Sequence, residues 1–317
     1  MWYTRAAEVG DAVAQAFLGW MYMQGQGVQR NRRKGFELLK QSCLQNCMQG
    51  QFNMGLVFFF QEFGVQDREK SFKWFLKAAK QGLKEAQYKV GEAYYSGYGV
   101  EQNYKQAFAW CQRAAKAGHA SAIASVGEMY RTGTGVEKDL RLALEYFQKA
   151  AEEYDDADAL DSLGQCYYTG EGVEQDYKRA FEYFSRANKV NDEHPCALFH
   201  LGRSNFLGHG VVQDYEKGVE YFRRASNLGD SEALKALGDC YYHGKHLDRD
   251  YEKAVEYYQR SVEAGDDEAC YQLGLCYFHG HGVTQDLEQA KTYWRKGAEV
   301  GSLSAGEALR EHFPDSA

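Results

Sequence analysis

A leucine–glycine pair recurs along the chain at a nearly constant interval, and this repeat constrains the fold more than any other feature of the sequence. The pair or a close variant stands at Leu18-Gly19, Met54-Gly55, Val90-Gly91, Val126-Gly127, Leu163-Gly164, Leu201-Gly202, Leu237-Gly238 and Leu273-Gly274. The successive steps are 36, 36, 36, 37, 38, 36 and 36 residues. A fixed period in this range is typical of a repeat array, in which stacked units bury one continuous core.

Each period predicts two helices, A and B, joined by a tight glycine loop. In one unit, Ala86, Val90 and Tyr94 form the apolar stripe of helix A, and the loop Gly97-Tyr98-Gly99-Val100 follows it. Thirteen residues after each repeat Leu stands an Asn or Asp that predicts the N-cap of helix B: Asn31, Asp67, Asn103, Asp139, Asp176, Asp214, Asp250 and Asp286. A glycine inside a helix costs about 1 kcal/mol relative to alanine. We therefore expect the repeat glycine to be there for close approach of the two helices.

The period divides residues 1–317 into one array of units. Residues 1–13 are a half-repeat (helix B), and residues 305–317 are a capping helix with Arg310 at the glycine position. A charged residue there suits an end whose outer face meets water. The eight repeats are 14–49, 50–85, 86–121, 122–158, 159–196, 197–232, 233–268 and 269–304. Because the chain begins inside a unit, either it is part of a longer array or the half-unit is its cap.

Two loops depart from the double-glycine pattern. The second repeat has Gln61-Glu62-Phe63-Gly64-Val65 in its place, and the seventh has Lys245-His246-Leu247 after a lone Gly244.

Composition narrows the kind of protein. The hydrophobic share of 44% indicates a packed chain, and the net charge of -8 opposes a broad nucleic-acid interface, which needs a basic face. We expect no membrane span and find no signal-peptide layout in the first thirty residues. The eight cysteines show no pairing pattern and are interpreted as free, mostly buried thiols. They favour a reducing compartment such as the cytoplasm, although the compartment itself stays unknown.

The motif Ala-x-x-x-Leu-Gly-x-x-Tyr-x-x-Gly-x-Gly-Val-x-x-Asp-x-x-x-Ala-x-x-Tyr-Phe-x-x-Ala recurs eight times in phase and resembles the Sel1-like repeat, a relative of the tetratricopeptide repeat. The resemblance covers essentially the whole chain. It implies an all-α, right-handed α/α superhelix (solenoid) of antiparallel helix pairs that serves as an adaptor or scaffold and is generally not a catalyst. Some cysteine-rich bacterial relatives carry paired cysteines in each repeat, and this sequence lacks them.

The usual catalytic motifs are missing from the sequence. Gly-x-Gly lacks the third glycine of a dinucleotide loop, and neither a phosphate loop nor His-Glu-x-x-His occurs. We therefore predict no catalytic residue, no cofactor and no metal. The nearest candidates for metal ligands are the loop histidines His243, His246, His279 and His281. The favoured interpretation is that these histidines lie on a solvated loop face. His209 recurs at the same loop position, which is expected to be exposed.

Binding is expected on the concave face, which the A helices of a solenoid line. The position two residues before the repeat Leu and the position two residues after it lie opposite the buried stripe of helix A. The residues at these two positions vary from unit to unit. We predict a protein-binding face formed by Phe52, Tyr88, Glu92, Glu128, Asp161, Gln165, Phe199, Arg203, Lys235, Asp239 and Tyr271. The alternative is that the aromatic residues lie half-buried over neighbouring helices. The mixture of charges suggests a protein or peptide ligand of mixed charge.

Three functions follow from these features. The first is an adaptor or scaffold that binds a protein segment, and the alternative is a regulatory subunit of a partner enzyme. An enzyme with an unrecognised site has little support, since the repeat-breaking units offer only Phe63, His243 and His246. The sequence leaves the partner and the oligomeric state open.

Overall fold

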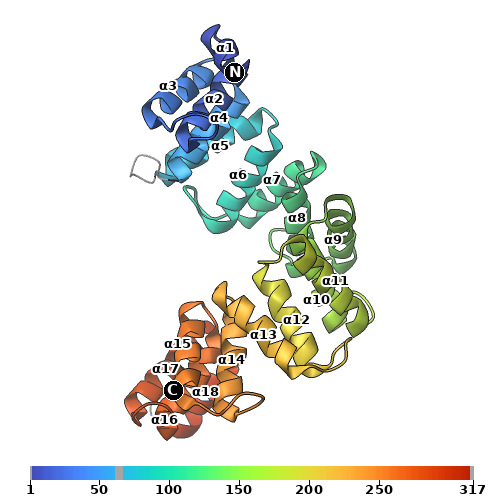
Figure 1. Cartoon of the computed structure of the whole chain (residues 1–317), viewed down its shortest axis with the longest axis vertical. Coiled ribbons are helices and arrows are strands. Elements are labelled where there is room, and N and C mark those ends of the chain that lie inside the picture. Colours follow the sequence, from blue (N-terminus) through green and yellow to red (C-terminus); the bar gives the residue numbers. More distant parts are fainter. Residues whose placement is uncertain (1, 61–66, 315–317) are drawn as a thin grey trace. The chain divides into compact units, whose positions relative to one another are not determined.

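The computed structural model describes residues 2–60 and 67–314. The helices of this described part, shown in Figure 1, are α1 (Trp2–Glu8), α2 (Ala12–Gln24), α3 (Arg32–Leu44), α4 (Met48–Phe59), α5 (Arg68–Lys80), α6 (Lys84–Ser96), α7 (Tyr104–Lys116), α8 (Ala120–Thr132), α9 (Leu140–Tyr154), α10 (Ala157–Thr169), α11 (Tyr177–Val190), α12 (Pro195–Leu207), α13 (Tyr215–Asn227), α14 (Ser231–His243), α15 (Tyr251–Glu263), α16 (Asp267–His279), α17 (Leu287–Val300) and α18 (Leu303–His312). The unusual loop Gln61–Val65, with Phe63, lies outside the described residues.

The helices pack in consecutive pairs, so the predicted all-α fold of paired helices is confirmed. Each even-numbered helix from α2 to α16 stands at an A position and the odd-numbered helix after it at a B position. Direct packing of A on B joins α2 with α3, α4 with α5, α6 with α7, α8 with α9, α12 with α13, α14 with α15, and α16 with α17. B helices also pack on the next A helix, as α5 does on α6 and α13 on α14. The last helix, α18, packs on α16 and α17, and its Arg310 is exposed as predicted.

Two compact units make up the chain, residues 1–159 and residues 160–317. The boundary falls in α10.

The predicted helix caps are confirmed. The side chain of each predicted Asn or Asp N-cap accepts a hydrogen bond from a backbone N–H in the first turn of its B helix. A helices end in left-handed glycines with φ between +71° and +79° at Gly25, Gly97, Gly133, Gly170, Gly208 and Gly280. Glycine adopts this conformation without the strain that a Cβ would cause, which explains the residue type.

Close approach explains the repeat glycine. An ideal Cβ built on Gly164 would lie 2.5 Å from Cδ1 of Phe184, and one on Gly238 would lie 2.5 Å from Cε1 of Tyr258. In every repeat the residue that meets this position comes from the paired B helix: Leu39, Phe75, Cys111, Phe147, Phe184, Phe222, Tyr258 and Trp294. The packing role predicted for the glycine is confirmed.

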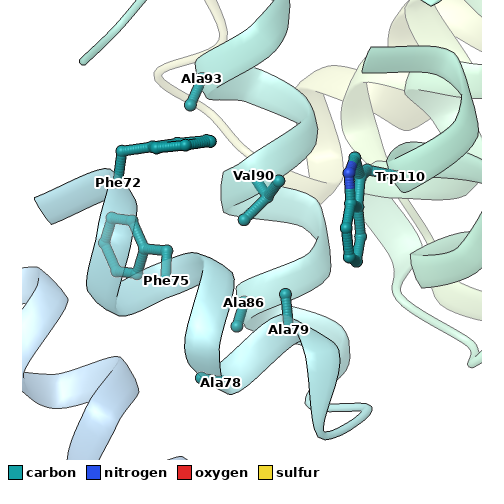
Figure 2. Close-up of a cluster of buried hydrophobic side chains, with 8 residues drawn as sticks. All are labelled: Phe72, Phe75, Ala78, Ala79, Ala86, Val90, Ala93 and Trp110. Carbon is teal, nitrogen blue, oxygen red and sulfur yellow. The ribbon is translucent and has the colours of Figure 1, made fainter. Parts of the chain in front are cut away.

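The core is continuous from one pair of helices to the next within a unit. Figure 2 shows one buried cluster of the first unit, to which α5 contributes Phe72 and Phe75, α6 contributes Val90, and α7 contributes Trp110. These side chains are between 0% and 8% exposed. Burying side chains of this size stabilises the fold by about 1.5–3 kcal/mol each, so neighbouring pairs depend on one another for their stability.

Candidate functional site

The surface formed by the positions two residues before and after each repeat Leu is called the A-helix face here. No residue of this face is fully exposed, and most are half-buried. Asp161 and Phe199 are only 4% and 8% exposed. For these two residues the expectation that packing leaves the positions free is wrong, because the next A helix, α12, covers Asp161 and the B helix α13 packs on Phe199.

The aromatic residues of this face lie over neighbouring helices, as the alternative interpretation held. The ring centroid of Phe52 lies 5.5 Å from that of Phe75, and the Tyr88 hydroxyl is 3.4 Å from the Ser125 hydroxyl of α8. Tyr271 packs against the cluster around Trp294. Their binding role stays a prediction.

In the first unit, a cleft of about 370 Å³ lies between the A helices α6 and α8. Tyr88, Glu92 and Tyr95 of α6 and Ser125, Glu128 and Met129 of α8 are among its lining residues, and we call it the α6–α8 cleft. It brings together three of the predicted binding residues, Tyr88, Glu92 and Glu128. The charges of the two glutamates are balanced by neighbouring side chains. Lys89 Nζ lies 2.7 Å from Glu92 Oε2, and Arg131 donates to both carboxylate oxygens of Glu128 at 2.8 Å.

In the second unit, a cleft of about 470 Å³ lies between the A helices α12 and α14. We call it the α12–α14 cleft, and its lining includes Phe199, Arg203 and Phe206 of α12 and Lys235, Asp239 and His243 of α14. Four predicted binding residues therefore meet here: Phe199, Arg203, Lys235 and Asp239.

Arg203 is held in place between aromatic and polar groups. Its guanidinium carbon lies 4.0 Å from the centroid of the Tyr168 ring, and its Nη2 donates to Nδ1 of His200 at 3.3 Å. Its Nε is buried and has no hydrogen-bond partner among the described residues. An unpaired buried donor costs about 1–3 kcal/mol.

The opposite wall of the cleft carries both signs of charge. Lys235 Nζ lies 3.8 Å from Asp266 Oδ2, and the Tyr258 hydroxyl donates to Asp239 Oδ1 at 2.7 Å. Burial raises the pKa of Asp239 above its usual value, against the lowering effect of the Tyr258 hydrogen bond and the Lys235 charge.

A polar cluster extends from Arg203 toward α10. Gln165 Nε2 donates to Asp161 Oδ2 at 2.8 Å, and this oxygen lies 3.7 Å from Nε2 of His200, too far for a hydrogen bond. Burial, with the charge of Arg203 and the proximity of His194, lowers the pKa of His200 to about 3. His200 is therefore neutral at pH 7, which lets its Nδ1 accept from Arg203.

Sequence reasoning missed His200. It lies one residue before the repeat Leu, where the other repeats have Phe17, Asn53, Lys89, Ser125, Ser162, Ala236 and Gln272. The signal that could have found it is that this position carries a histidine in one repeat only.

Four predicted residues are outside both clefts. Phe52 packs with Phe75, Tyr271 packs with the C-terminal cluster, and Asp161 and Gln165 belong to the polar cluster around His200.

The loop histidines fit the sequence interpretation in part. A solvated loop face fits His243, His246 and His279, which are exposed. The rings of His209, His246 and His281 also stack on tyrosines that begin the preceding B helices. The ring centroids are 4.2 Å apart for His209 and Tyr177, 3.4 Å for His246 and Tyr215, and 4.5 Å for His281 and Tyr251. The three rings thus link neighbouring repeats.

The described residues include no group of three or more histidine, cysteine, aspartate or glutamate side chains placed to hold a metal ion. No helix of the described part combines the length and apolar character needed to cross a membrane.

All eight cysteines are free, as predicted. Those that follow the repeat Leu by three residues, Cys166, Cys240 and Cys276, are buried. Burial raises the pKa of Cys240 to about 11 and that of Cys276 to about 12. The thiols of Cys240 and Cys276 are therefore protonated at pH 7.

Paired helices that stack on one another, closed by glycine caps and open to solvent at clefts between A helices, define an α-solenoid repeat protein. The Sel1 repeat family model matches residues 1–11, 12–47, 49–83, 84–119, 120–155, 157–192, 197–230, 231–266 and 267–302. The chain belongs to the Sel1 repeat family. The repeat boundaries given above begin up to two residues later than these and stay a prediction.

Solved structures support the fold. A protective antigen of uropathogenic Escherichia coli with an SLR fold is 29% identical, with a TM-score of 0.64 over 98% of this chain and 73% of that one. A Sel1 repeat protein from Oxalobacter formigenes is 26% identical, with a TM-score of 0.61 over 98% of this chain and 88% of its own. No curated protein matches the sequence. Sel1 repeat proteins are generally protein-interaction scaffolds, and their fold is typically non-catalytic.

Proposed function

We propose that this protein is a non-catalytic adaptor that binds a protein segment on its A-helix face, the concave side of the solenoid, and so assembles a complex. The observation that carries the proposal is that seven of the eleven predicted residues line one of two clefts between neighbouring A helices.

The size and lining of the clefts suit side chains of a bound segment. Volumes of about 370 and 470 Å³ lie in the range of about 300–1,000 Å³ that is usual for ligand pockets. Tyrosine and arginine are the residue types that most often anchor a partner at an interface, and Tyr88, Tyr95 and Arg203 supply them.

The test is affinity capture from a lysate of the source cell, read by mass spectrometry. The cleft variant removes one accessible apolar side chain and one charge from each cleft: Tyr95→Ala and Glu128→Gln, Leu207→Ala and Lys235→Gln. Tyr95 and Leu207 are 50% and 48% exposed, so their loss should barely change stability. We expect the wild-type protein to capture a partner that the cleft variant retains at least about tenfold less well, as truncation of interface anchors predicts.

A matched variant controls for surface changes of the same kind. It carries Leu44→Ala and Leu287→Ala with Lys149→Gln and Glu220→Gln, all exposed on B helices. Both variants leave the net charge unchanged. Capture of the same partner by the cleft variant, or equal loss in both variants, would contradict the proposal.

The captured partner also decides whether the chain regulates an enzyme. If the partner is an enzyme whose activity changes on adding this protein, the adaptor is a regulatory subunit. The free cysteines make a reducing compartment such as the cytoplasm part of the proposal.

A further inference from the structure

We infer that the α12–α14 cleft recognises an acidic side chain of a bound protein segment, with Arg203 as the receptor for the carboxylate and Phe206 and Leu207 beside it as the receptor for an adjacent apolar side chain. This inference rests on the proposed function and names the chemistry of its ligand.

The first argument is the unmet hydrogen-bonding capacity of Arg203. A guanidinium has five N–H donors, and among the described residues the hydrogen-bond acceptor that Arg203 reaches is His200, through Nη2. Its Nε–H is buried and unpaired, and no carboxylate of the described residues forms an ion pair with it. A carboxylate in the cleft would supply the missing charge and an acceptor for the terminal N–H groups of the guanidinium, since Nε itself is buried.

The second argument is that Arg203 is already positioned. The Tyr168 ring lies 4.0 Å from the guanidinium carbon, the Phe199 ring lies 5.4 Å from it, and His200 holds Nη2. A cation fixed in this way loses little conformational entropy when it binds an anion. This arrangement distinguishes Arg203 from the exposed arginines of the B helices.

The third argument is the balance of charge across the cleft. Lys235 has Asp266 at 3.8 Å, and its charge also acts on Asp239, which accepts from Tyr258. The charges of the α14 wall are therefore compensated within that wall and its surroundings. Glu232 and Lys245 also line the cleft and carry opposite charges, so the charge of Arg203 on the α12 wall is left to the ligand.

The apolar part of the cleft gives the second half of the specificity. Phe206, half-buried, and Leu207, 48% exposed, follow Arg203 by one turn of α12 and form the accessible apolar surface, next to the buried rings of Phe199 and Phe222. A carboxylate alone would leave this surface in contact with water. A large apolar side chain next to the acidic one would cover it and gain about 25 cal/mol per Å² buried.

An array of random dodecamer peptides tests the inference. The peptides are attached through their carboxyl ends, so that side chains supply the carboxylates they present. We expect the peptides bound by the wild-type protein to be enriched in Asp or Glu within two positions of a large apolar residue. Arg203→Met should weaken their binding by roughly tenfold or more, the usual effect of losing a charge-assisted hydrogen bond.

Three controls keep the test specific. Arg203→Lys keeps the charge but not the planar fork and should retain part of the binding. Arg223→Met makes the same substitution at an exposed position of α13 and should change nothing. Replacing the acidic residue of the strongest peptide by its amide should weaken binding to the wild-type protein as much as Arg203→Met does, which tests the contact without altering the fold.

The outcomes separate the inference from the proposed function. Bound peptides without acidic enrichment, or acidic peptides that bind Arg203→Met as well as wild type, would overturn the inference. If those peptides still lose binding to the cleft variant, the proposed function stands. Absence of any bound peptide also counts against the inference, whereas the capture experiment, which does not need a linear segment, then decides the proposed function.

Discussion

Gly164→Val is expected to lower the free energy of unfolding by about 2–4 kcal/mol. A Cβ at this position would approach the Phe184 ring to 2.5 Å at Cδ1, and Phe184 is itself completely buried. The ring cannot move into solvent, so either α10 and α11 separate or Phe184 leaves its rotamer. Valine has a better helix propensity than glycine by a few tenths of a kcal/mol. The cost of overpacking is several times larger than this gain, so the substitution destabilises the fold.

Gly306→Ala is the matched control for this substitution. Gly306 also lies inside an A-position helix, α18, but a Cβ there would meet only the Cβ of Ala298, at 3.8 Å. Helix propensity should therefore dominate and raise the stability by up to about 1 kcal/mol. Urea unfolding followed by circular dichroism measures both. Equal midpoints for Gly164→Val and wild type would contradict the close-packing role of the repeat glycine.

The second large effect is a loss of stability on mild acidification that depends on His200. Burial lowers the pKa of His200 from 6.5 to about 3, so between these values the unfolded chain binds a proton that the folded chain does not. Stability is therefore complete above pH 6.5 and falls as the pH drops through this window, by up to about 1.4 kcal/mol per pH unit. From pH 7 to pH 5 the contribution of this residue amounts to about 2 kcal/mol.

The groups around His200 act in both directions, and those that disfavour its charge dominate. Protonation would place its charge beside Arg203 and remove the acceptor for Arg203 Nη2, while Asp161, at 3.7 Å, would favour the charged form. Burial and Arg203 outweigh Asp161 in setting the pKa. Unfolding free energies at pH 7 and pH 5 should differ by about 2 kcal/mol less in His200→Gln than in wild type. Equal pH dependence in the two proteins would show that His200 is protonated without penalty.

Features that depend on one helix or one loop could be predicted from the sequence. The N-caps from Asn31 to Asp286 and the left-handed glycines follow from local backbone chemistry, and the repeat places them in phase. The repeat glycine was also predictable, since an unfavourable residue that recurs inside a helix requires a packing reason.

Features that depend on how repeats stack could not be predicted. The helical period placed Asp161 and Phe199 on the side of their helices that faces away from the core. The period of one helix does not show how closely a neighbouring helix packs, and neighbouring helices bury both residues. The hydrogen bond between Tyr168 and His209 joins residues 41 apart in sequence, and the Tyr242–His281 bond repeats it. No local pattern predicts such partners. The buried, unpaired Nε of Arg203 likewise could not be predicted, because it depends on how Tyr168 and His200 pack around the guanidinium.

Site-specific photo-crosslinking in the source cell tests most directly whether the A-helix face holds a protein segment. A photoreactive amino acid is placed at Glu128 or Lys235, in the two clefts, and at Lys149 or Glu220, exposed on the B helices α9 and α13. We expect both cleft positions to crosslink to the same partner protein and neither B-helix position to do so. Crosslinks that form only from the B-helix positions, or equally from all four, would contradict this expectation.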